Sequence, residues 1–175
     1  MLHKALLTFP TLTTKQLTLR QLVESDGQAI FLLRSEPTLN KYLDRKLSQT
    51  LEEALHFIRN IQTRQFLYWA IVDTVSGKLL GTISLFYFSD EMNTCGIGYE
   101  LLTDYQGRGI MQEAAKKIIA FAFDRLGIET IEAFTHKDNQ RSTRLLQKLT
   151  FEKTEFTDAN NPDVIVFRLF NHRAA

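Results

Sequence analysis

Hydrophobic and polar residues follow each other along this chain in short runs whose period changes between two residues and three to four residues. Residues 14–22 (TKQLTLRQL) alternate like a strand and place Leu17 and Leu19 on one face. We expect a helix to follow from Ser25, because Ser25 and Gln28 have the spacing of a capping box. The chain therefore opens with a predicted strand and a predicted helix.

A second capping pair precedes a stronger amphipathic pattern. Thr50 and Glu53 have the same spacing, ahead of an apolar stripe at helical intervals formed by Leu51, Ala54, Leu55, Ile58 and Ile61. Residues 68–73 and 78–88 then read as two strands joined by a hairpin turn at Gly77 and the serine before it. These patterns predict a second helix followed by an antiparallel pair.

The second half of the chain alternates between strand and helix patterns. We expect a helix to end at Leu126, with Gly127 as its C-terminal stop. The other predicted elements are strands at 95–102, 128–135, 151–157 and 163–170 and a helix at 139–149. The fold class is α+β, with a mixed, mainly antiparallel central sheet of about seven strands and flanking helices. No linker composition interrupts the chain, so residues 1–175 form one predicted domain.

Composition and charge exclude several classes of protein. The chain has 175 residues, of which 44% are hydrophobic, and a formal net charge of +1, which gives no basic field for nucleic acid or for an anionic membrane. A single cysteine, Cys95, cannot form an internal disulfide, as is typical of a reducing compartment. The N-terminal run is too weak for a signal peptide, and no stretch is long and apolar enough to span a bilayer. We expect a cytoplasmic protein.

The segment DYQGRGIMQE, residues 104–113, places two glycines where a helix pattern begins. Gly107 and Gly109 have two interpretations at such a site. They form either a tight strand-to-helix connection or a cradle in which an anion meets the bare N–H groups of the first helical turn. The dinucleotide spacing GxGxxG would need a glycine at Gln112, and no Gly-Lys-Ser/Thr run of a P-loop exists. Both familiar phosphate motifs are therefore excluded.

Two longer segments carry a resemblance to a known family. GYELLTDYQGRGIMQEAAKKIIAFAF (98–123) and NQRSTRLLQKLTF (139–151) resemble the Gcn5-related N-acetyltransferases, in particular the branch that acetylates the N-termini of ribosomal proteins. The opening strand and the GKLLGTISL hairpin (77–85) occur in the family's order. The resemblance implies acetyl-CoA as cosubstrate. Its pyrophosphate would be bound by backbone N–H groups of Gln106, Gly107, Arg108, Gly109, Ile110 and Met111.

The sequence departs from the family pattern at two positions. Asp104 stands where the family often has Gln or Arg, and an acidic side chain beside pyrophosphate is unfavourable unless it points outward or Arg108 offsets it. Thr150 stands where the family commonly has a glycine at a helix end. Because threonine tolerates a positive φ poorly, we expect this turn to be built differently.

The resemblance also implies groups for the chemistry of acetyl transfer. The backbone N–H of Leu102 is the candidate oxyanion donor, and Leu101 and Thr103 would line the pantetheine arm. Ser142 lies on the inward face of its helix, because three leucines follow it at helical spacing, and it is the candidate acid for the departing thiolate. A purely structural role for Ser142 stays open. Asn139 has two compatible roles, as a helix cap and as a contact to the cofactor arm.

Glu100 alternates with its neighbours in the strand and is the candidate base, acting through water. An α-amine of pKa about 8 is roughly a tenth neutral at pH 7, whereas a lysine side chain near 10.4 is neutral in about one molecule in 2,500. A modest base is therefore enough for an α-amine. Four scattered histidines and one cysteine give no metal-ligand pattern, so we expect no metal.

These features predict an acetyl-CoA-dependent N-acetyltransferase in which a primary amine attacks directly within a ternary complex. The resemblance points to a protein N-terminal α-amine, in particular that of a ribosomal protein, as acceptor. Two alternatives remain: acetylation of a small amine such as a polyamine, an aminoglycoside or an amino-acid derivative, and a CoA-binding regulatory module without turnover. The sequence does not name the acceptor or decide between a monomer and a homodimer.

Overall fold

A computed structural model describes residues 8–64, 66–157 and 161–172. Its helices are α1 (Gly27–Ser35), α2 (Pro37–Asn40), α3 (Leu51–Thr63), α4 (Ile110–Asp124) and α5 (Gln140–Lys148). Its strands are β1 (Leu12–Thr13), β2 (Leu17–Gln21), β3 (Tyr68–Asp73), β4 (Leu79–Ser89), β5 (Thr94–Leu101), β6 (Thr130–His136), β7 (Glu152–Thr157) and β8 (Val164–Phe170). The α+β prediction is confirmed.

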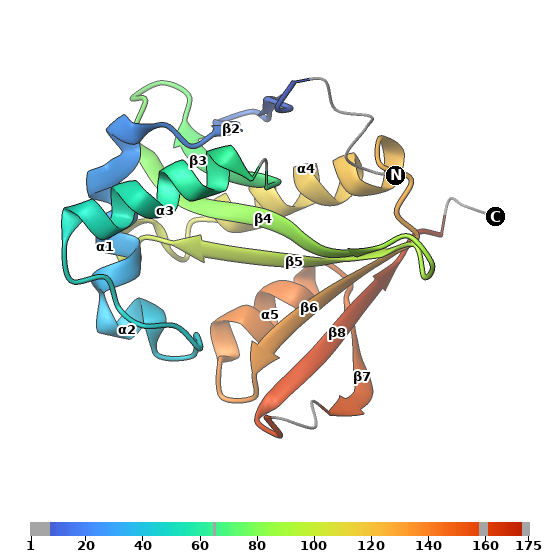
Figure 1. The fold of residues 1–175 in the computed structure, drawn as a ribbon. Coiled ribbons are helices and arrows are strands. Elements are labelled where there is room, and N and C mark those ends of the chain that lie inside the picture. The colour runs from blue at the N-terminus through green and yellow to red at the C-terminus, as the bar shows by residue number, and fades with distance from the viewer. Residues whose placement is uncertain (1–7, 65, 158–160, 173–175) are drawn as a thin grey trace.

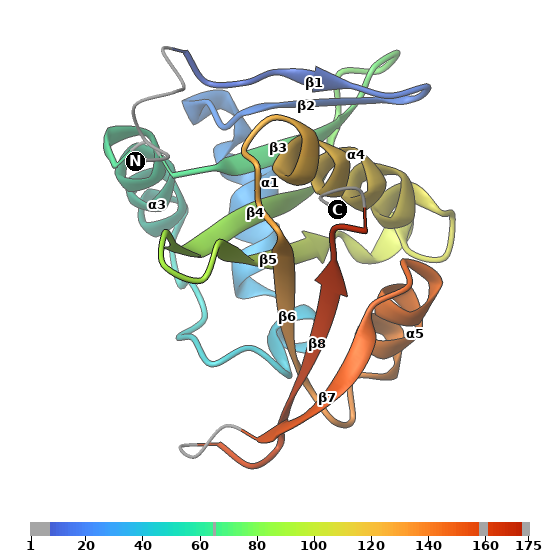
Figure 2. The same ribbon diagram turned by 90° about the vertical axis from the view of Figure 1, so that its right-hand side faces the viewer.

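The strands form a single sheet in the order β1-β2-β3-β4-β5-β6-β8-β7 (Figures 1 and 2). Each neighbouring pair is antiparallel except β5 and β6, which are parallel and connected through α4. This pair is short: its register joins Thr94 to Thr130, Cys95 to Ile131 and Gly96 to Glu132, although both strands continue beyond it. Figure 1 shows β6 and β8 running down and away from β5. The sheet therefore opens along the second half of β5.

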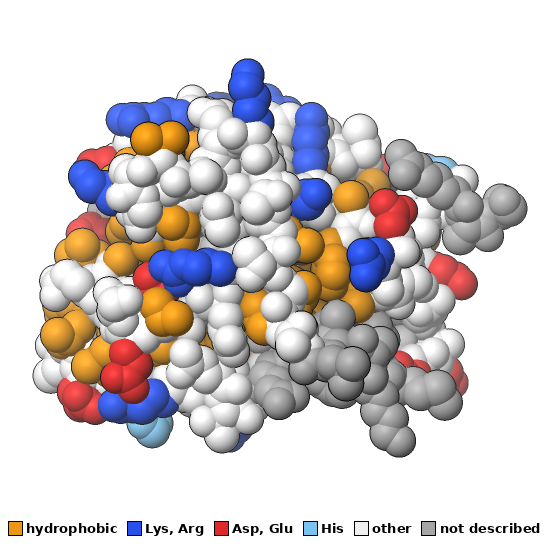
Figure 3. Space-filling view, turned by 90° about the horizontal axis from the view of Figure 1, so that it is seen from above, with side chains coloured by type: hydrophobic (Ala, Val, Ile, Leu, Met, Phe, Trp, Pro, Cys, Tyr) orange, Lys and Arg blue, Asp and Glu red, His pale blue; other side chains and the backbone are white. Residues whose placement is uncertain are grey.

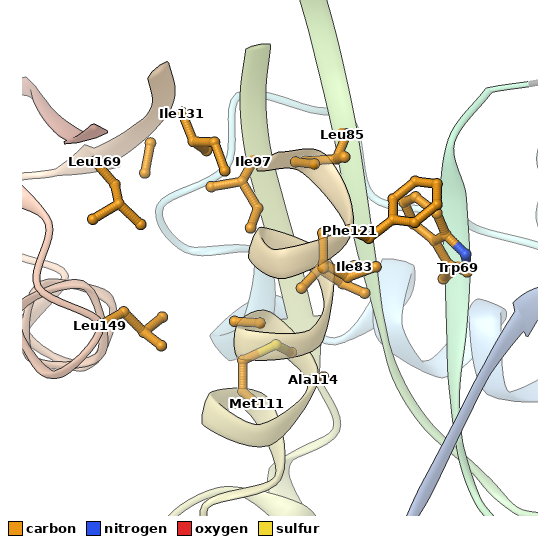
Figure 4. Packing of buried hydrophobic residues seen from close by; sticks show 14 of the residues in the cluster. Trp69, Ile83, Leu85, Ile97, Met111, Ala114, Phe121, Ile131, Leu149 and Leu169 are labelled. Atoms are coloured by element: carbon orange, nitrogen blue, oxygen red, sulfur yellow. The ribbon is translucent and has the colours of Figure 1, made fainter. Parts of the chain in front are cut away.

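Two hydrophobic clusters hold helices against the sheet. The larger cluster joins α4 and α5 to the strands, with Trp69, Ile83, Ile97 and Ile118 among its buried members (Figure 4). The smaller cluster joins α1 and α3 to β3 and the start of β4 through residues such as Ile30, Ile58 and Ala70. Alternation along β3 explains the division, because Trp69 and Ala70 face opposite sides of the sheet. Burial on both faces fixes the register of the central strands.

Most of the predicted elements are confirmed within a few residues, including the β3–β4 hairpin. The cap of α3 is as predicted, with Thr50 Oγ1 accepting from the Glu53 N–H at 3.3 Å. The predicted Ser25–Gln28 capping box is wrong: Asp26 accepts from the Val23 N–H at 2.9 Å and pairs with Arg20, and a 3-10 turn precedes α1. The sequence also missed the two-residue β1 and the short α2.

The turn after α5 corrects another expectation. Thr150 adopts a φ of +64°, the left-handed conformation that the family's glycine would supply. Its N–H donates to the Gln147 carbonyl at 3.0 Å, and the Phe151 N–H donates to the Leu146 carbonyl at 3.0 Å. The turn is therefore not built differently, and Thr150 carries its backbone strain. Burial of Phe151 in the larger cluster holds the chain in this conformation.

Candidate active site

The predicted glycine turn lies open at the start of α4. Gly107 and Gly109 have φ values of +75° and +77°, and a Cβ added to either would meet no heavy atom within 4 Å. Gly109 is the N-cap residue of α4, and no side chain caps the helix there. The first N–H groups of an α-helix have no partner within the helix and carry its positive dipole end. This turn can therefore receive an anion from solvent.

The side chains around the glycine turn leave its positive end uncompensated. Asp104 and Arg108 are exposed, and Arg108 lies 5.8 Å from the ring centre of Tyr105. Glu113 lies in the first turn of α4, but its carboxylate is bonded to Thr14 Oγ1 at 2.5 Å and to Gln16 Nε2 at 3.0 Å. Burial raises the pKa of Glu113, but these hydrogen bonds outweigh burial and leave its pKa below the usual value. The acidic group in the first turn is thus engaged with the segment before β2.

The structure corrects the predicted oxyanion donor. The backbone N–H of Leu102 donates to the Leu80 carbonyl at 2.9 Å, so it is already used in pairing with β4. Successive N–H groups of a strand point to alternate sides. The N–H groups of Leu101 and Tyr99 therefore point away from β4, to the side from which β6 has diverged. The Leu101 N–H, and not that of Leu102, is therefore the donor left exposed where β6 diverges from β5.

Polar side chains connect the end of β5 to α5. Gln106 Nε2 donates to the Leu101 carbonyl at 2.9 Å, and Arg141 Nη1 donates to Gln106 Oε1. Thr103 is exposed on the short turn between β5 and Gln106. Ile110 is half-buried and Met111 buried, so their side chains anchor α4 beneath the glycine turn. Leu101 and Leu102 pack on opposite faces of the sheet, and residues 106 to 111 lead from the end of β5 into the start of α4.

A hydroxyl pair lies between β5 and α5. The Tyr99 hydroxyl is 2.9 Å from Ser142 Oγ, and either atom can be the donor. Burial raises the pKa of Tyr99 to about 12, and its bond to Ser142 only partly opposes this, so the phenol keeps its proton at neutral pH. Asn139 caps α5, with Oδ1 accepting from the Ser142 N–H at 3.2 Å. The capping role of Asn139 is confirmed, and its predicted contact with the cofactor arm stays a prediction.

Sequence reasoning passed over Tyr99. The available signal was its period-two position between Ile97 and Leu101, which sends all three side chains to the α4 side of β5. Ser142 lies 43 residues further along the chain than Tyr99. The contact between them depends on how α5 packs against β5, which local patterns do not predict.

Glu100 faces the other side of β5 and is ion-paired. Both of its carboxylate oxygens accept from the guanidinium of Arg45, and the Nη2–Oε2 distance is 3.0 Å. Arg45 Nε also donates to Asn40 Oδ1 at 2.6 Å, and the Asn40 amide donates to the carbonyls of Leu33 and Glu36. Each carboxylate oxygen keeps one further acceptor position for a water. No local pattern around Glu100 predicts Arg45, 55 residues away, as its partner.

The pair belongs to a charged cluster, which we define as Arg34, Arg45 and Glu100. Tyr68 lies beside it with its hydroxyl 3.0 Å from Thr82 Oγ1. Burial, with Glu100 as a smaller contributor, raises the pKa of Tyr68 above its usual value. Burial and the nearby Arg45 lower the pKa of Arg34. The cluster concentrates charge on the α1–α3 side of the sheet, whereas the Tyr99–Ser142 pair on the other side is neutral.

Two further glycines in β5, Gly96 and Gly98, let the Phe86 ring approach the strand backbone closely. A Cβ at Gly96 would lie 2.5 Å from the Phe86 ring, and one at Gly98 would lie 3.0 Å from it. Side chains at these positions would displace the ring, so glycine lets it lie directly on the strand. Tyr42, from the segment after α2, stacks on His136 at the end of β6 with ring centres 5.1 Å apart. Aromatic rings from distant segments thus border the diverging strands.

The arrangement fits a cosubstrate that consists of a pyrophosphate and an extended amide-containing arm. The uncapped start of α4 offers donors to an anion, and the free edge of β5 offers N–H and C=O groups to an extended amide chain. No group of His, Cys, Asp and Glu side chains within the described ranges could hold a metal ion. Cys95 is buried, and burial raises the pKa of its thiol to about 12, which suits a packing thiol and not a nucleophile.

Charged side chains of both signs are mixed on one face of the molecule (Figure 3). Lys and Arg side chains and Asp and Glu side chains both occur on the face shown in Figure 3, and neither kind forms a continuous field there. Across the ranges that the structure covers, no helix is both long and apolar enough to cross a membrane.

Comparisons with known proteins agree with this site. A family model described as an acetyltransferase (GNAT) domain matches residues 16–152. The uncharacterized N-acetyltransferase YoaA of Bacillus subtilis is 30% identical over 149 residues, which cover 83% of this chain and 84% of that protein. An acetyltransferase of the GNAT family from Bacillus anthracis has a similar solved structure, with a TM-score of 0.82 and 18% identity, covering 92% of this chain and 98% of that one.

A second solved structure, the ribosomal-protein-S5-alanine acetyltransferase of Vibrio fischeri, has a TM-score of 0.73 and 23% identity, and the match covers 93% of this chain and 97% of that one. At such identities the two structures establish a shared fold. The family match spans most of the chain, from the segment before β2 to the start of β7, and includes the glycine turn, β5 and α5. The chain therefore belongs to the GNAT family and is an N-acetyltransferase.

Proposed function

We propose that this enzyme transfers the acetyl group of acetyl-CoA to the N-terminal α-amine of a protein, in particular a ribosomal protein, in the cytoplasm. The observation that carries the cosubstrate assignment is the uncapped, solvent-open glycine turn beside the free edge of β5. Gly107, Arg108, Gly109, Ile110 and Met111 would bind the pyrophosphate through their backbone N–H groups, as the family resemblance implies, whereas the Gln106 N–H already donates to the Thr103 carbonyl at 3.2 Å. Leu101, Leu102, Thr103, Asn139 and Ser142 would border the arm.

Three groups of the chain would act on the reacting atoms. The Leu101 N–H, free of β4, would stabilise the oxyanion that forms when the amine attacks the thioester carbonyl. Ser142 would donate a proton to the departing thiolate and be reprotonated through Tyr99, whose hydroxyl is 2.9 Å away and would in turn take a proton from solvent water, so that both hydroxyls end the cycle protonated. Glu100 would accept the amine proton through a water while it stays paired with Arg45.

The choice of an α-amine rests on proton affinity. A carboxylate acting through a water is a modest base, and a lysine side chain would impose a handicap of roughly 4.6 kcal/mol at pH 7. An α-amine of pKa about 8 needs little help at that pH. The name of the Vibrio fischeri enzyme, whose fold this chain shares, supports a ribosomal protein as the acceptor.

The test is transfer from radiolabelled acetyl-CoA to three acceptors: a peptide with a free N-terminus, the same peptide blocked at its N-terminus but carrying a lysine, and a polyamine. We expect label on the free N-terminus. Label only on the polyamine would replace the proposal with the small-amine alternative. Binding of acetyl-CoA without transfer to any of these, or to a bacterial lysate, would favour the regulatory module.

Variants of α5 test the proton donor within the same assay. Ser142→Ala should lower kcat at least about tenfold and leave the affinity for acetyl-CoA nearly unchanged, because the hydroxyl acts on the leaving group. Thr143→Ala is the matched control, since the neighbouring Oγ1 is buried without a hydrogen-bond partner in the part of the chain that the structure describes. Equal rates for the two variants would make Ser142 structural.

A further inference from the structure

A cavity of about 260 Å³ lies outside the site described above, between α1, α3 and the segment that precedes α3. Its lining includes Arg34 from α1, Lys46 and Ser48 from the segment, and Glu53, His56 and Phe57 from α3. We call it the side pocket. Ser48 is buried, and its N–H donates to the Arg34 carbonyl at 3.0 Å, which joins the segment to the end of α1. Three parts of the chain thus meet around one small volume.

The charges that line the side pocket are mainly positive. Arg34 and Lys46 contribute two cations, and His56 adds a third when it is protonated. Glu53 is the one acidic side chain in the lining, and its Oε2 accepts from the Gln49 N–H at 2.7 Å as part of the start of α3. Its charge is therefore partly engaged by a backbone donor, and the pocket keeps a net positive character.

Arg34 also has an unused donor. Its Nε is shielded from solvent and has no hydrogen-bond partner among the described residues. The guanidinium is held by stacking, with Cζ 4.0 Å from the centre of the Phe57 ring. A buried donor without an acceptor costs free energy, and a guanidinium binds carboxylate and phosphate through paired N–H groups. The guanidinium is therefore oriented by stacking, and its buried Nε lacks an acceptor.

We propose that the side pocket binds an anionic group, a carboxylate or a phosphate, between Arg34 and Lys46. The group comes either from a free anion or from an acidic part of the acceptor. Arg34 belongs to both the pocket and the charged cluster, so an anion there lies close to the Arg45–Glu100 pair that flanks β5. The proposal that the pocket binds anions does not depend on the proposed acceptor.

Binding is measured by NMR titration of the protein with inorganic phosphate and with acetate at constant ionic strength. The Ser48 amide and the His56 ring should shift in a saturable way, and Lys46→Gln should weaken the binding about fivefold, as expected for loss of one charged contact. Lys78→Gln, in the exposed turn between β3 and β4, is the matched control and should change nothing. Shifts that do not saturate, or that Lys46→Gln leaves unchanged, would overturn the proposal.

The glycine turn is a competing phosphate site, so the titration is repeated with Gly109→Asp. Shifts at Ser48 that persist in this variant belong to the side pocket, whereas shifts that vanish belong to the glycine turn and contradict the proposal. Arg34→Gln removes the unpaired Nε, and its fold is checked by circular dichroism. If that variant unfolds, Lys46→Gln still decides the question.

A kinetic comparison distinguishes the two sources of the anion. For an acceptor peptide with an acidic side chain, Lys46→Gln should raise KM about fivefold if the pocket receives the acceptor, and leave KM of the matched neutral peptide unchanged. Equal KM changes for both peptides, together with retained phosphate binding, would assign the pocket to a free anion. Failure of acetyl transfer itself would refute the proposed function and leave the phosphate result standing.

Discussion

The glycine turn begins the helix that covers one face of the sheet, the charged cluster lies on the other face, and the two are built in different ways. The glycine turn exposes backbone: Gly107 and Gly109 adopt positive φ in open space, and no side chain caps α4. The charged cluster depends on side chains, with Arg45 and Glu100 paired across 55 residues of sequence. The glycine turn presents backbone groups, which do not depend on side-chain identity, whereas the charged cluster requires particular side chains in contact.

This difference separates what the two regions can recognise. Backbone donors at a helix start suit the pyrophosphate that all acetyl-CoA-dependent enzymes of the family share. Charged side chains from α1, the segment before α3 and β5 suit an acceptor, which differs between enzymes. Substitutions on the two sides should therefore act on different measured quantities.

The largest effect should come from Gly109→Asp. A carboxylate at the uncapped start of α4 would repel pyrophosphate and occupy its donors, so acetyl-CoA affinity should fall by about a hundredfold or more, the loss of two charged hydrogen bonds. Affinity is measured by calorimetry, and the fold is checked by circular dichroism. Gly77→Asp is the control, because Gly77 has a φ of +70° and equally open surroundings far from this site. Unchanged affinity in Gly109→Asp would refute the cradle.

An intermediate effect is expected from the charged cluster, measured by urea unfolding. Arg45→Met and Glu100→Gln should each cost about 2 kcal/mol, because each leaves a largely buried partner without its opposite charge. The double variant should cost less than the sum of the two single variants. The exposed pair of Arg59 and Glu52 is the control, and breaking it should cost less than about 0.5 kcal/mol. Additive costs at Arg45 and Glu100 would contradict the coupling.

The smallest effect concerns the neutral face of β5 and is a pH dependence. Burial raises the pKa of Cys95 from 9.0 to about 12, so the unfolded chain loses the thiol proton first as pH rises. The stability from this group is complete below pH 9 and is lost as pH rises toward 12. Between pH 8 and pH 10 the loss should be about 1.4 kcal/mol. Cys95→Ala should flatten this decline in unfolding free energy, and an equal decline in the variant would contradict the assignment.

The glycine turn could be predicted from the sequence, whereas the charged cluster could not. The glycine turn, the helix after it and the inward position of Ser142 follow from local spacing, and the structure confirms them because backbone conformation depends on nearby residues. Leu102 was the wrong oxyanion donor, because which N–H pairs with β4 depends on the register between two strands. The predicted cap at Ser25 was wrong because Asp26 instead accepts hydrogen bonds from the Arg20 guanidinium and the Val23 N–H.

By itself the sequence determined the order of the longer elements, the glycine turn at the start of α4 and, through resemblance, the family. The tertiary structure alone decided that β5 and β6 diverge after Gly96, that Tyr99 meets Ser142, and that Arg45 pairs with Glu100. The physical reason is the distance along the sequence over which each kind of interaction acts. Periodicity and glycine placement act within a few residues, whereas the Tyr99–Ser142 and Arg45–Glu100 contacts join residues 43 and 55 positions apart, which only the packing of the sheet and its helices brings together.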